Sequence, residues 1–227
     1  MYNTIKLAFL GLTCLAFISC KKDVASENGM LADGNAAKSN IGAAASDSYF
    51  PNRNGSEYTY IDTTMEGSVT ISRSVIAISG DTTIDGTTYS KTPGTSAETS
   101  TYHNYTDGET RVVSYKGEDK LTTTLLKDNA AVGTTWKDVF SNEGVPTTYE
   151  WKMVARGLTR TVQGITYSNV ILVHLDGTAD MPVQGKVVFA NSDYYYAPNV
   201  GLIENIAYDP ATGKTQLHRV LQKSIVP

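Results

Sequence analysis

The sequence predicts an all-β protein of about twelve antiparallel strands, arranged in two similar halves that form one open curved barrel or a sandwich. Three observations predict this fold class: the composition, an alternation of apolar and polar residues, and an internal repeat. The 227 residues include 19 Gly and 14 Tyr beside abundant Thr, and only 19% are charged. Because Tyr and Thr favour strands and Gly favours turns, this composition disfavours a helical bundle, a coiled coil and a long disordered chain.

Apolar and polar side chains alternate with a period of two from residue 49 onward. Tyr149, Trp151 and Met153 fall on one face of such a segment, with Glu150 and Lys152 on the other. This alternation is typical of a strand that is half buried. The segment 170–175 (VILVHL) is apolar on both faces, so we expect it to run through the middle of the core. No segment shows a convincing amphipathic helical period.

Turn signals separate these strands at intervals of about 8 to 20 residues. Asp-Gly pairs are the clearest, because they tolerate the positive φ angles of a tight hairpin. The segment 209–213 (DPATG) suits a type I turn that is followed by a left-handed glycine. The other turn signals are Gly80-Asp81, Asp85-Gly86, Asp107-Gly108, Asn142-Glu143-Gly144 and Gln163-Gly164.

An internal repeat divides the folded part of the chain. Residues 83–90 (TIDGTTYS) match residues 161–168 (TVQGITYS) at five of eight positions, 78 residues apart. Further matches occur in the same order along both halves: Gly55 with Gly133, Tyr58 with Trp136, Leu121 with Leu217 and Leu125 with Leu221. We therefore predict a duplication within a single β domain, residues 48–227, with halves at 49–128 and 129–227. Half a sheet leaves edges and one apolar face bare, so the halves should join edge to edge or face to face.

The first residues are typical of an export signal. Residues 7–18 form an apolar run that is too short to span a membrane and within the range of a signal-peptide core. The run ends in Phe17, Ile18, Ser19 and Cys20, which resembles a bacterial lipobox, although Leu is more usual than Phe17. The resemblance implies a lipoprotein signal peptide at 1–19 and a lipid on Cys20. The alternative is an ordinary secretory signal with a chance cysteine.

Residues 20–47 are predicted to be a flexible tether. Ala, Ser, Asn, Gly and Asp dominate them, and they contain no aromatic side chain. Such a segment buries too little apolar surface to offset the entropy of ordering it. The opening Cys-Lys-Lys-Asp resembles lipoproteins of the Bacteroidota, which implies a bacterial outer-membrane protein anchored by lipid. The periplasmic face and the cell surface both stay open.

Charge and motifs exclude several functions. The 19 basic and 23 acidic residues give a net charge of -4, which argues against binding nucleic acid through a broad basic face. Cys14 leaves with the signal and Cys20 is acylated, so neither a disulfide nor a cysteine-ligated metal is expected. His174 and Asp176 share a strand face and make at most half of a metal site. Without a catalytic motif, we expect no enzyme activity, no metal and no cofactor.

Two short stretches carry a further resemblance. Residues 194–203 (YYYAPNVGLI) are similar to a stretch near the end of many secreted bacterial β proteins, including the uncharacterised DUF3108-like lipoproteins. Asn199 stands where Gly is usual in that stretch. Residues 132–136 (VGTTW) resemble the midpoint marker of the same proteins. The resemblance implies an all-β envelope protein and supplies no catalytic residue.

Aromatic side chains are the remaining candidates for a binding site. Large amphipathic rings stack on sugars or line apolar cavities, but they also fill cores. We therefore expect a lipid-anchored envelope protein whose β domain binds a glycan or an apolar molecule without catalysis. The alternative is a structural or assembly protein without a small-molecule site. The candidate ligand-binding residues are Trp136, Tyr149, Trp151, Tyr194 and Tyr196.

Overall fold

A computed structural model describes residues 48–51, 53–65, 69–92, 100–116 and 119–227. The predicted signal peptide, Cys20 and the tether lie outside these residues. Throughout the described part the regular structure is strand, with thirteen strands and no helix, and so no helix there is long and apolar enough to cross a membrane. The all-β prediction is confirmed.

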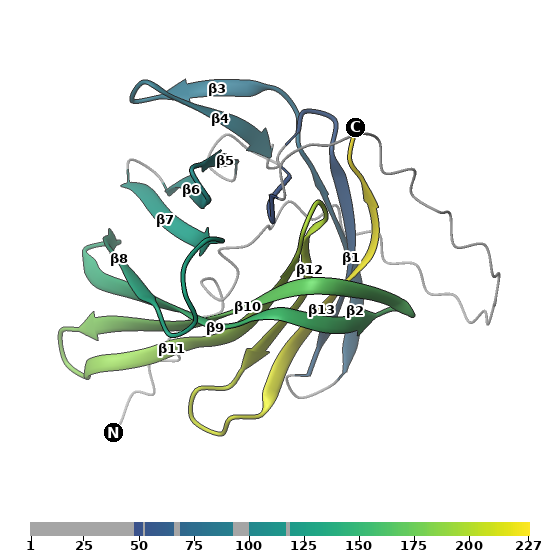
Figure 1. Ribbon diagram of the computed structural model, residues 1–227. Coiled ribbons are helices and arrows are strands. Elements are labelled where there is room, and N and C mark those ends of the chain that lie inside the picture. Colours follow the sequence, from purple (N-terminus) through teal and green to yellow (C-terminus); the bar gives the residue numbers. More distant parts are fainter. Residues whose placement is uncertain (1–47, 52, 66–68, 93–99, 117–118) are drawn as a thin grey trace.

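The strands form two antiparallel sheets that are folded over one another (Figure 1). The larger sheet has the order β2-β1-β13-β12-β11-β10-β9-β8, and the smaller has the order β3-β4-β5-β6-β7. The strands are β1 (Glu57–Thr64), β2 (Thr70–Ala77), β3 (Asp81–Ile84), β4 (Thr87–Thr92), β5 (Thr101–Thr106), β6 (Glu109–Lys116), β7 (Asp119–Lys127), β8 (Thr135–Asn142), β9 (Val145–Val162), β10 (Ile165–Met181), β11 (Gly185–Ala197), β12 (Gly201–Tyr208) and β13 (Thr215–Ile225).

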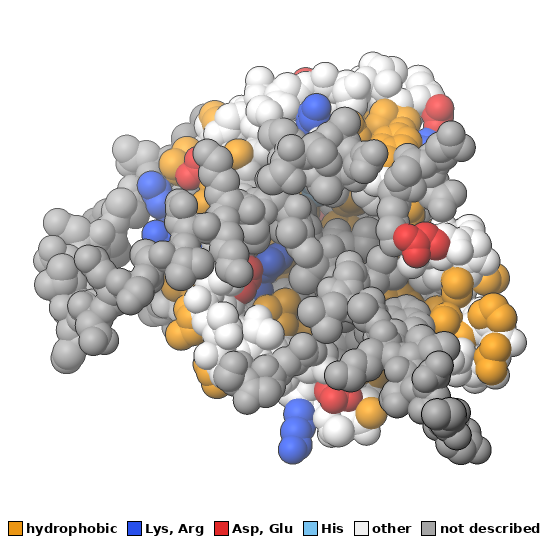
Figure 2. All heavy atoms as spheres, turned by 180° about the vertical axis from the view of Figure 1, so that it is seen from behind, with side chains coloured by type: hydrophobic (Ala, Val, Ile, Leu, Met, Phe, Trp, Pro, Cys, Tyr) orange, Lys and Arg blue, Asp and Glu red, His pale blue; other side chains and the backbone are white. Residues whose placement is uncertain are grey.

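One core lies between the two sheets. Val112 of β6 and Leu126 of β7 bring the smaller sheet into a cluster that also contains Tyr58, Trp151 and Val173 of the larger sheet. The segment 170–175, expected to be central, contributes four residues that are almost completely buried. The chain therefore forms the open, curved sandwich among the alternatives. On the face seen in Figure 2, basic and acidic side chains of the described residues are interspersed and do not form a single charged patch.

The chain crosses from one sheet to the other between β2 and β3. The Ile78 N–H donates to the carbonyl of Ser56, beside β1, at 2.8 Å. The next residues pair with β4 instead, because the Ser79 N–H donates to the Lys91 carbonyl, and the Lys91 N–H donates to the carbonyl of Gly80. Gly80 has a φ of 68°, which a side chain would resist. The turn signal at Gly80-Asp81 therefore marks the point at which the chain leaves the larger sheet and enters the smaller one.

The repeated eight-residue segments form the same kind of hairpin. In both, the two central residues have positive φ angles: 49° and 78° at Asp85 and Gly86, and 51° and 78° at Gln163 and Gly164. In both, the residues that flank the turn pair directly. These are the features of a type I′ turn, whose twist matches that of the strands it joins.

The starts of the two halves also share a turn. Gly55 and Gly133 have φ angles of 87° and 89°. Each is the third residue of a four-residue turn in which the first carbonyl, of Arg53 or Ala131, accepts the N–H of the fourth residue. The halves meet at two edges, where β1 pairs with β13 and β7 lies beside β8. Two halves joined edge to edge would meet in this way. Their origin by duplication stays a prediction.

Side chains link β7 to β8 without a backbone ladder. The Asp138 carboxylate accepts hydrogen bonds from the Thr123 hydroxyl at 2.7 Å and from the Thr124 N–H at 2.9 Å. The indole N–H of Trp136 donates to the carbonyl of Thr124 at 2.6 Å. Both backbone groups of Thr124 are thereby satisfied, and the edge of the smaller sheet is held against the larger one.

A buried ion pair lies at the other joint, between β1 and β13. The Arg219 guanidinium donates to both carboxylate oxygens of Asp62, at 2.6 and 2.9 Å, and the hydroxyl of Ser74 donates to one of them at 2.9 Å. The guanidinium also lies over the ring of Tyr60, 5.5 Å from its centroid. Asp62 is 6% exposed and Arg219 is 4% exposed, so each charge depends on the other for its stabilisation.

Candidate functional site

The five aromatic residues predicted to bind a ligand lie in the core. They come from β8, β9 and β11, and their rings touch in a continuous row. All five are buried, with 1% to 8% of their surface exposed: Trp136, Tyr149, Trp151, Tyr194 and Tyr196.

Ring geometry within this row is that of ordinary core packing. Trp136 and Trp151 are stacked with their centroids 6.4 Å apart, and Trp151 lies 5.5 Å from Tyr194 at a tilt of 53°. Such offset and tilted contacts stabilise buried rings. The packing favours core filling over an exposed stacking platform, because the rings present no open face. A ligand contact by any of these five residues stays a prediction.

The structure points to a different region, at one end of the sandwich. Residues 48–51, which we call the strap, lie at this end, ahead of the turn at Asn54 and Gly55 that leads into β1. The N–H of Asn199 donates to the carbonyl of Ser48 at 2.8 Å, and the Tyr49 hydroxyl donates to the Asn169 carbonyl at 2.7 Å. The strap is therefore tied to the β11–β12 turn and to β10, while its remaining residues face the gap between the sheets.

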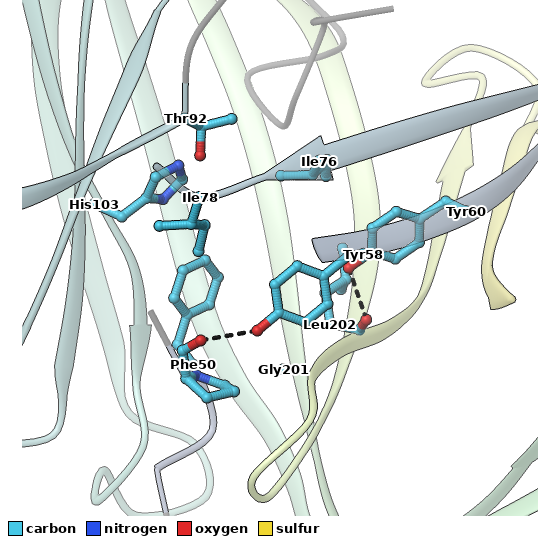
Figure 3. A pocket seen from close by; sticks show the side chains of 10 residues that line it. Phe50, Tyr58, Tyr60, Ile76, Ile78, Thr92, His103, Gly201 and Leu202 are labelled. Atoms are coloured by element: carbon cyan, nitrogen blue, oxygen red, sulfur yellow. Dashed lines mark hydrogen bonds between the residues drawn. The ribbon is translucent and has the colours of Figure 1, made fainter. Parts of the chain in front are cut away.

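A small, partly enclosed cavity lies behind the strap. Its volume is about 20 Å³, which is enough for about one water molecule. Figure 3 shows the ring of Phe50 at one side of it, with the hydroxyl of Thr92 and the ring of His103 above. The apolar walls come from both β1 and β2 and from β12: Tyr58, Tyr60, Ile76, Ile78 and Leu202.

A larger, open groove of about 330 Å³ lies on the outer side of the strap. It shares Phe50, Pro51 and His103 with the cavity, so these residues, the Phe50 ring among them, stand between the two spaces. The groove is otherwise mainly polar and receives side chains from the strap region, the β3–β4 hairpin, β5 and the β11–β12 turn. Its polar lining includes Arg53, Asp81, Thr88, Ser90, Asn104 and Tyr105.

Several polar side chains of this groove are held in place by their neighbours. The Asn104 amide donates to the carbonyl of Thr88 at 2.8 Å, and the Ser90 hydroxyl donates to the Asp81 carboxylate at 3.1 Å. The Arg53 guanidinium donates to the carbonyl of Pro227 at 2.8 Å. Side chains fixed in this way lose little freedom on binding a ligand, which favours recognition.

His103 lies at the floor of the groove and is only 1% exposed. Its ring stacks on Phe50, with the centroids 5.4 Å apart, and its Nε2 lies 3.2 Å from the Thr101 hydroxyl. Burial lowers the pKa of His103 to about 3, because the imidazolium cannot be solvated there. The ring is therefore neutral at physiological pH and suited to packing and hydrogen bonding.

The His174 and Asp176 pair, predicted as half of a metal site, belongs to a local hydrogen-bond network on the outer face of the larger sheet. His174 Nδ1 lies 2.7 Å from the carboxylate of Asp193, which also accepts from the Tyr208 hydroxyl at 3.1 Å. The hydrogen bond to Asp193 raises the pKa of His174, although partial burial opposes this. Within the described ranges, no three His, Cys, Asp or Glu side chains come together to hold a metal ion.

A second polar cluster on this face was not predicted from sequence. Glu204 of β12, 5% exposed, accepts from Arg160 at 2.5 Å and lies 2.7 Å from His218. Burial would raise the pKa of Glu204, but the hydrogen bonds from Arg160 and His218 outweigh it and lower that pKa. Arg160 also lies over the Tyr195 ring at 4.2 Å. The cluster fastens the end of the long β9–β10 hairpin to the sheet.

The strap and its groove were also not predicted from the sequence. Their one sequence signal is the tripeptide Tyr49-Phe50-Pro51, the first aromatic residues after a long segment without any. Polar residues of the groove come from segments that are far apart in the sequence, and nothing local marks Asn104 or His103 as neighbours of the strap.

A search of solved structures found two related folds. A protein from Parabacteroides distasonis, described provisionally as a lipoprotein, has a TM-score of 0.54 and 15% identity, covering 79% of this chain and 99% of its own. An exported protein from Bacteroides fragilis with a YmcC-like fold has a TM-score of 0.41 and 13% identity, with the same coverage. No model of a known protein family matches the chain, and no curated protein matches it in sequence. The first likeness establishes the shared fold, and the DUF3108-like resemblance stays a prediction.

Proposed function

We propose that this protein is exported, is anchored to the bacterial outer membrane through a lipid on Cys20, and binds a glycan in the groove beside the strap without catalysing a reaction. The lipobox at residues 17–20 supports the anchor. The fold shared with a protein described provisionally as a lipoprotein supports the same class of protein.

The groove itself is the observation that supports binding. Its volume of about 330 Å³ is within the range of small-ligand sites. A carboxylate, a guanidinium and an amide line it, and these groups suit the hydroxyl groups of a sugar. The half-buried ring of Phe50 and the ring of Tyr105 supply apolar surface for the C–H face of a sugar ring.

The lipid anchor is tested by metabolic labelling with a fatty acid. We expect the full chain to incorporate the label and Cys20→Ala to lose it, because only the thiol of Cys20 follows the lipobox. Cys14→Ala is the matched control and should keep the label, since Cys14 lies within the signal. Label that persists in Cys20→Ala would contradict the anchor.

Binding is tested by calorimetric titration of the full chain with neutral oligosaccharides of two to four units. Asp81→Asn and Asn104→Ala should each weaken binding by about tenfold or more, because the first replaces a charged acceptor with a neutral amide and the second removes an oriented amide from the groove. Asp85→Asn is the matched control: Asp85 lies in the turn of the same hairpin, outside the groove, and its side chain is 80% exposed. Equal weakening by all three variants would contradict the site.

A structural or assembly role is the second candidate, and one observation favours it. The aromatic row that was expected to bind a ligand is sealed in the core, and the cavity behind the strap holds about one water molecule. A body filled in this way serves as a rigid support. If none of the oligosaccharides binds, this role becomes the better account.

A further inference from the structure

The Phe50 side chain occupies the passage between the groove and the cavity. Its ring is stacked on His103, and Figure 3 shows it alongside Ile78 and next to Tyr58. Phe50 is only half buried, and it belongs to the strap, in which Tyr49 and Phe50 pack against the core. The strap also forms hydrogen bonds to the body at Ser48 and Tyr49, together with one from the Tyr58 hydroxyl to the Pro51 carbonyl at 2.8 Å.

The cavity behind this ring contains an unpartnered polar group. Thr92 is 3% exposed, its hydroxyl forms no hydrogen bond with any described residue, and it points into the cavity. A buried hydroxyl without a partner costs free energy, so natural proteins rarely keep one unless water or a ligand satisfies it. Apart from the imidazole of His103, the other walls are mainly aromatic and aliphatic. The cavity is thus a mainly apolar space with the Thr92 hydroxyl at its inner end.

The space held by the Phe50 ring is of the right size for a ligand. If the ring swung out with the strap, its volume would join the cavity of about 20 Å³ and open both to the groove. An apolar cavity of about 150 Å³ is known to hold a benzene molecule. The combined space is therefore suited to one phenyl-sized group.

We propose that the ligand of the groove carries a phenyl-sized apolar group, which displaces Phe50 and enters the cavity. Where that group bears a hydroxyl, the Thr92 hydroxyl forms a hydrogen bond with it. This inference rests on the proposed function and specifies the class of ligand. Phe50 is then the internal occupant of the apolar subsite, and the strap is the element that moves.

The first test compares two glycosides on the unmodified full chain. Phenyl β-D-glucopyranoside should bind at least ten times more tightly than methyl β-D-glucopyranoside, and only the phenyl compound should shift the NMR signals of the Phe50 ring. Equal affinities, or an unchanged Phe50 signal on binding of the phenyl compound, would overturn the proposal.

The second test opens the subsite by mutation. Phe50→Ala should bind phenol at least ten times more tightly than the unmodified chain, and Phe50→Leu should fall between them. Adding Thr92→Val to Phe50→Ala should weaken the binding of phenol at least fivefold and leave the binding of toluene unchanged, because toluene has no hydroxyl to bond to Thr92. The proposal would be overturned if phenol bound Phe50→Ala and Phe50→Leu no more tightly than the unmodified chain. It would also be overturned if Thr92→Val weakened the binding of toluene as much as that of phenol.

The two tests separate this inference from the proposed function. If oligosaccharides bind in the groove but phenol binds the Phe50 variants no more tightly than the unmodified chain, the proposed glycan site is supported and the apolar subsite is contradicted. If phenol binds Phe50→Ala more tightly but no saccharide binds any form of the protein, the apolar subsite is supported and the glycan function is contradicted. Thermal unfolding of each variant establishes that it is folded before the titration.

Discussion

Replacing Arg219 with Met is expected to lower the free energy of unfolding by about 3–5 kcal/mol. The guanidinium is the partner of Asp62 in a buried pair at the joint between β1 and β13. Its removal leaves a carboxylate in the core to which, among the described residues, only the Ser74 hydroxyl still donates. An uncompensated buried charge costs far more than the pair itself contributes.

Urea unfolding, followed by circular dichroism, measures this effect. The double variant Asp62→Leu with Arg219→Met should recover most of the loss, because it removes both charges and keeps apolar volume. Lys137→Met is the matched control, since Lys137 and Glu150 form a pair on the surface and should contribute less than about 1 kcal/mol. A loss for Arg219→Met as small as that of Lys137→Met would show that the joint does not depend on this pair.

The second large effect is a loss of stability in mild acid caused by His103. Burial holds the pKa of His103 near 3 in the folded chain, against about 6.5 when unfolded. As the pH falls below about 6.5, His103 binds a proton in the unfolded chain but stays neutral in the folded chain. Protonation therefore stabilises the unfolded state relative to the folded state. Between pH 7 and pH 5 this lowers the free energy of unfolding by about 2 kcal/mol, and the loss continues until the pH nears 3.

The measurement is urea unfolding across this pH range in the unmodified chain and in His103→Phe. The difference between the two should grow by about 2 kcal/mol between pH 7 and pH 5. His174 acts in the opposite sense: its raised pKa stabilises the fold at low pH, and this contribution is lost as the pH rises through that pKa. His174→Gln therefore serves as the control that keeps the His103 effect. A pH profile that is unchanged by His103→Phe would contradict the buried, neutral state.

The fold class could be predicted because its signals are local. Alternation along β9 and the Asp-Gly and Gln-Gly turns depend on neighbouring residues alone, and the observed φ angles at Asp85 and Gln163 are those that the turns require. The crossing at Gly80 could not be predicted in the same way. It depends on which distant strand accepts each hydrogen bond, and the residues 78–80 carry no sign of that choice.

The candidate site was harder to predict, because the same residue types serve two purposes. Trp151 and Tyr196 would look alike in a stacking platform and in a core, and only the position of the second sheet decides between them. His103 has no distinguishing neighbour in sequence, yet its burial against Phe50 defines the floor of the groove. Packing between distant segments, which sequence pattern does not encode, determines the site.

Amide NMR during titration of the full chain with phenyl β-D-glucopyranoside tests the central claim most directly. The account predicts chemical-shift changes that are concentrated at the groove, at Asp81, Ser90 and Asn104, and at Phe50 in the strap. Residues on the outer face of the larger sheet, such as His174 and Glu204, should not respond. Changes confined to that outer face, or no saturable change anywhere, would contradict a binding site beside the strap.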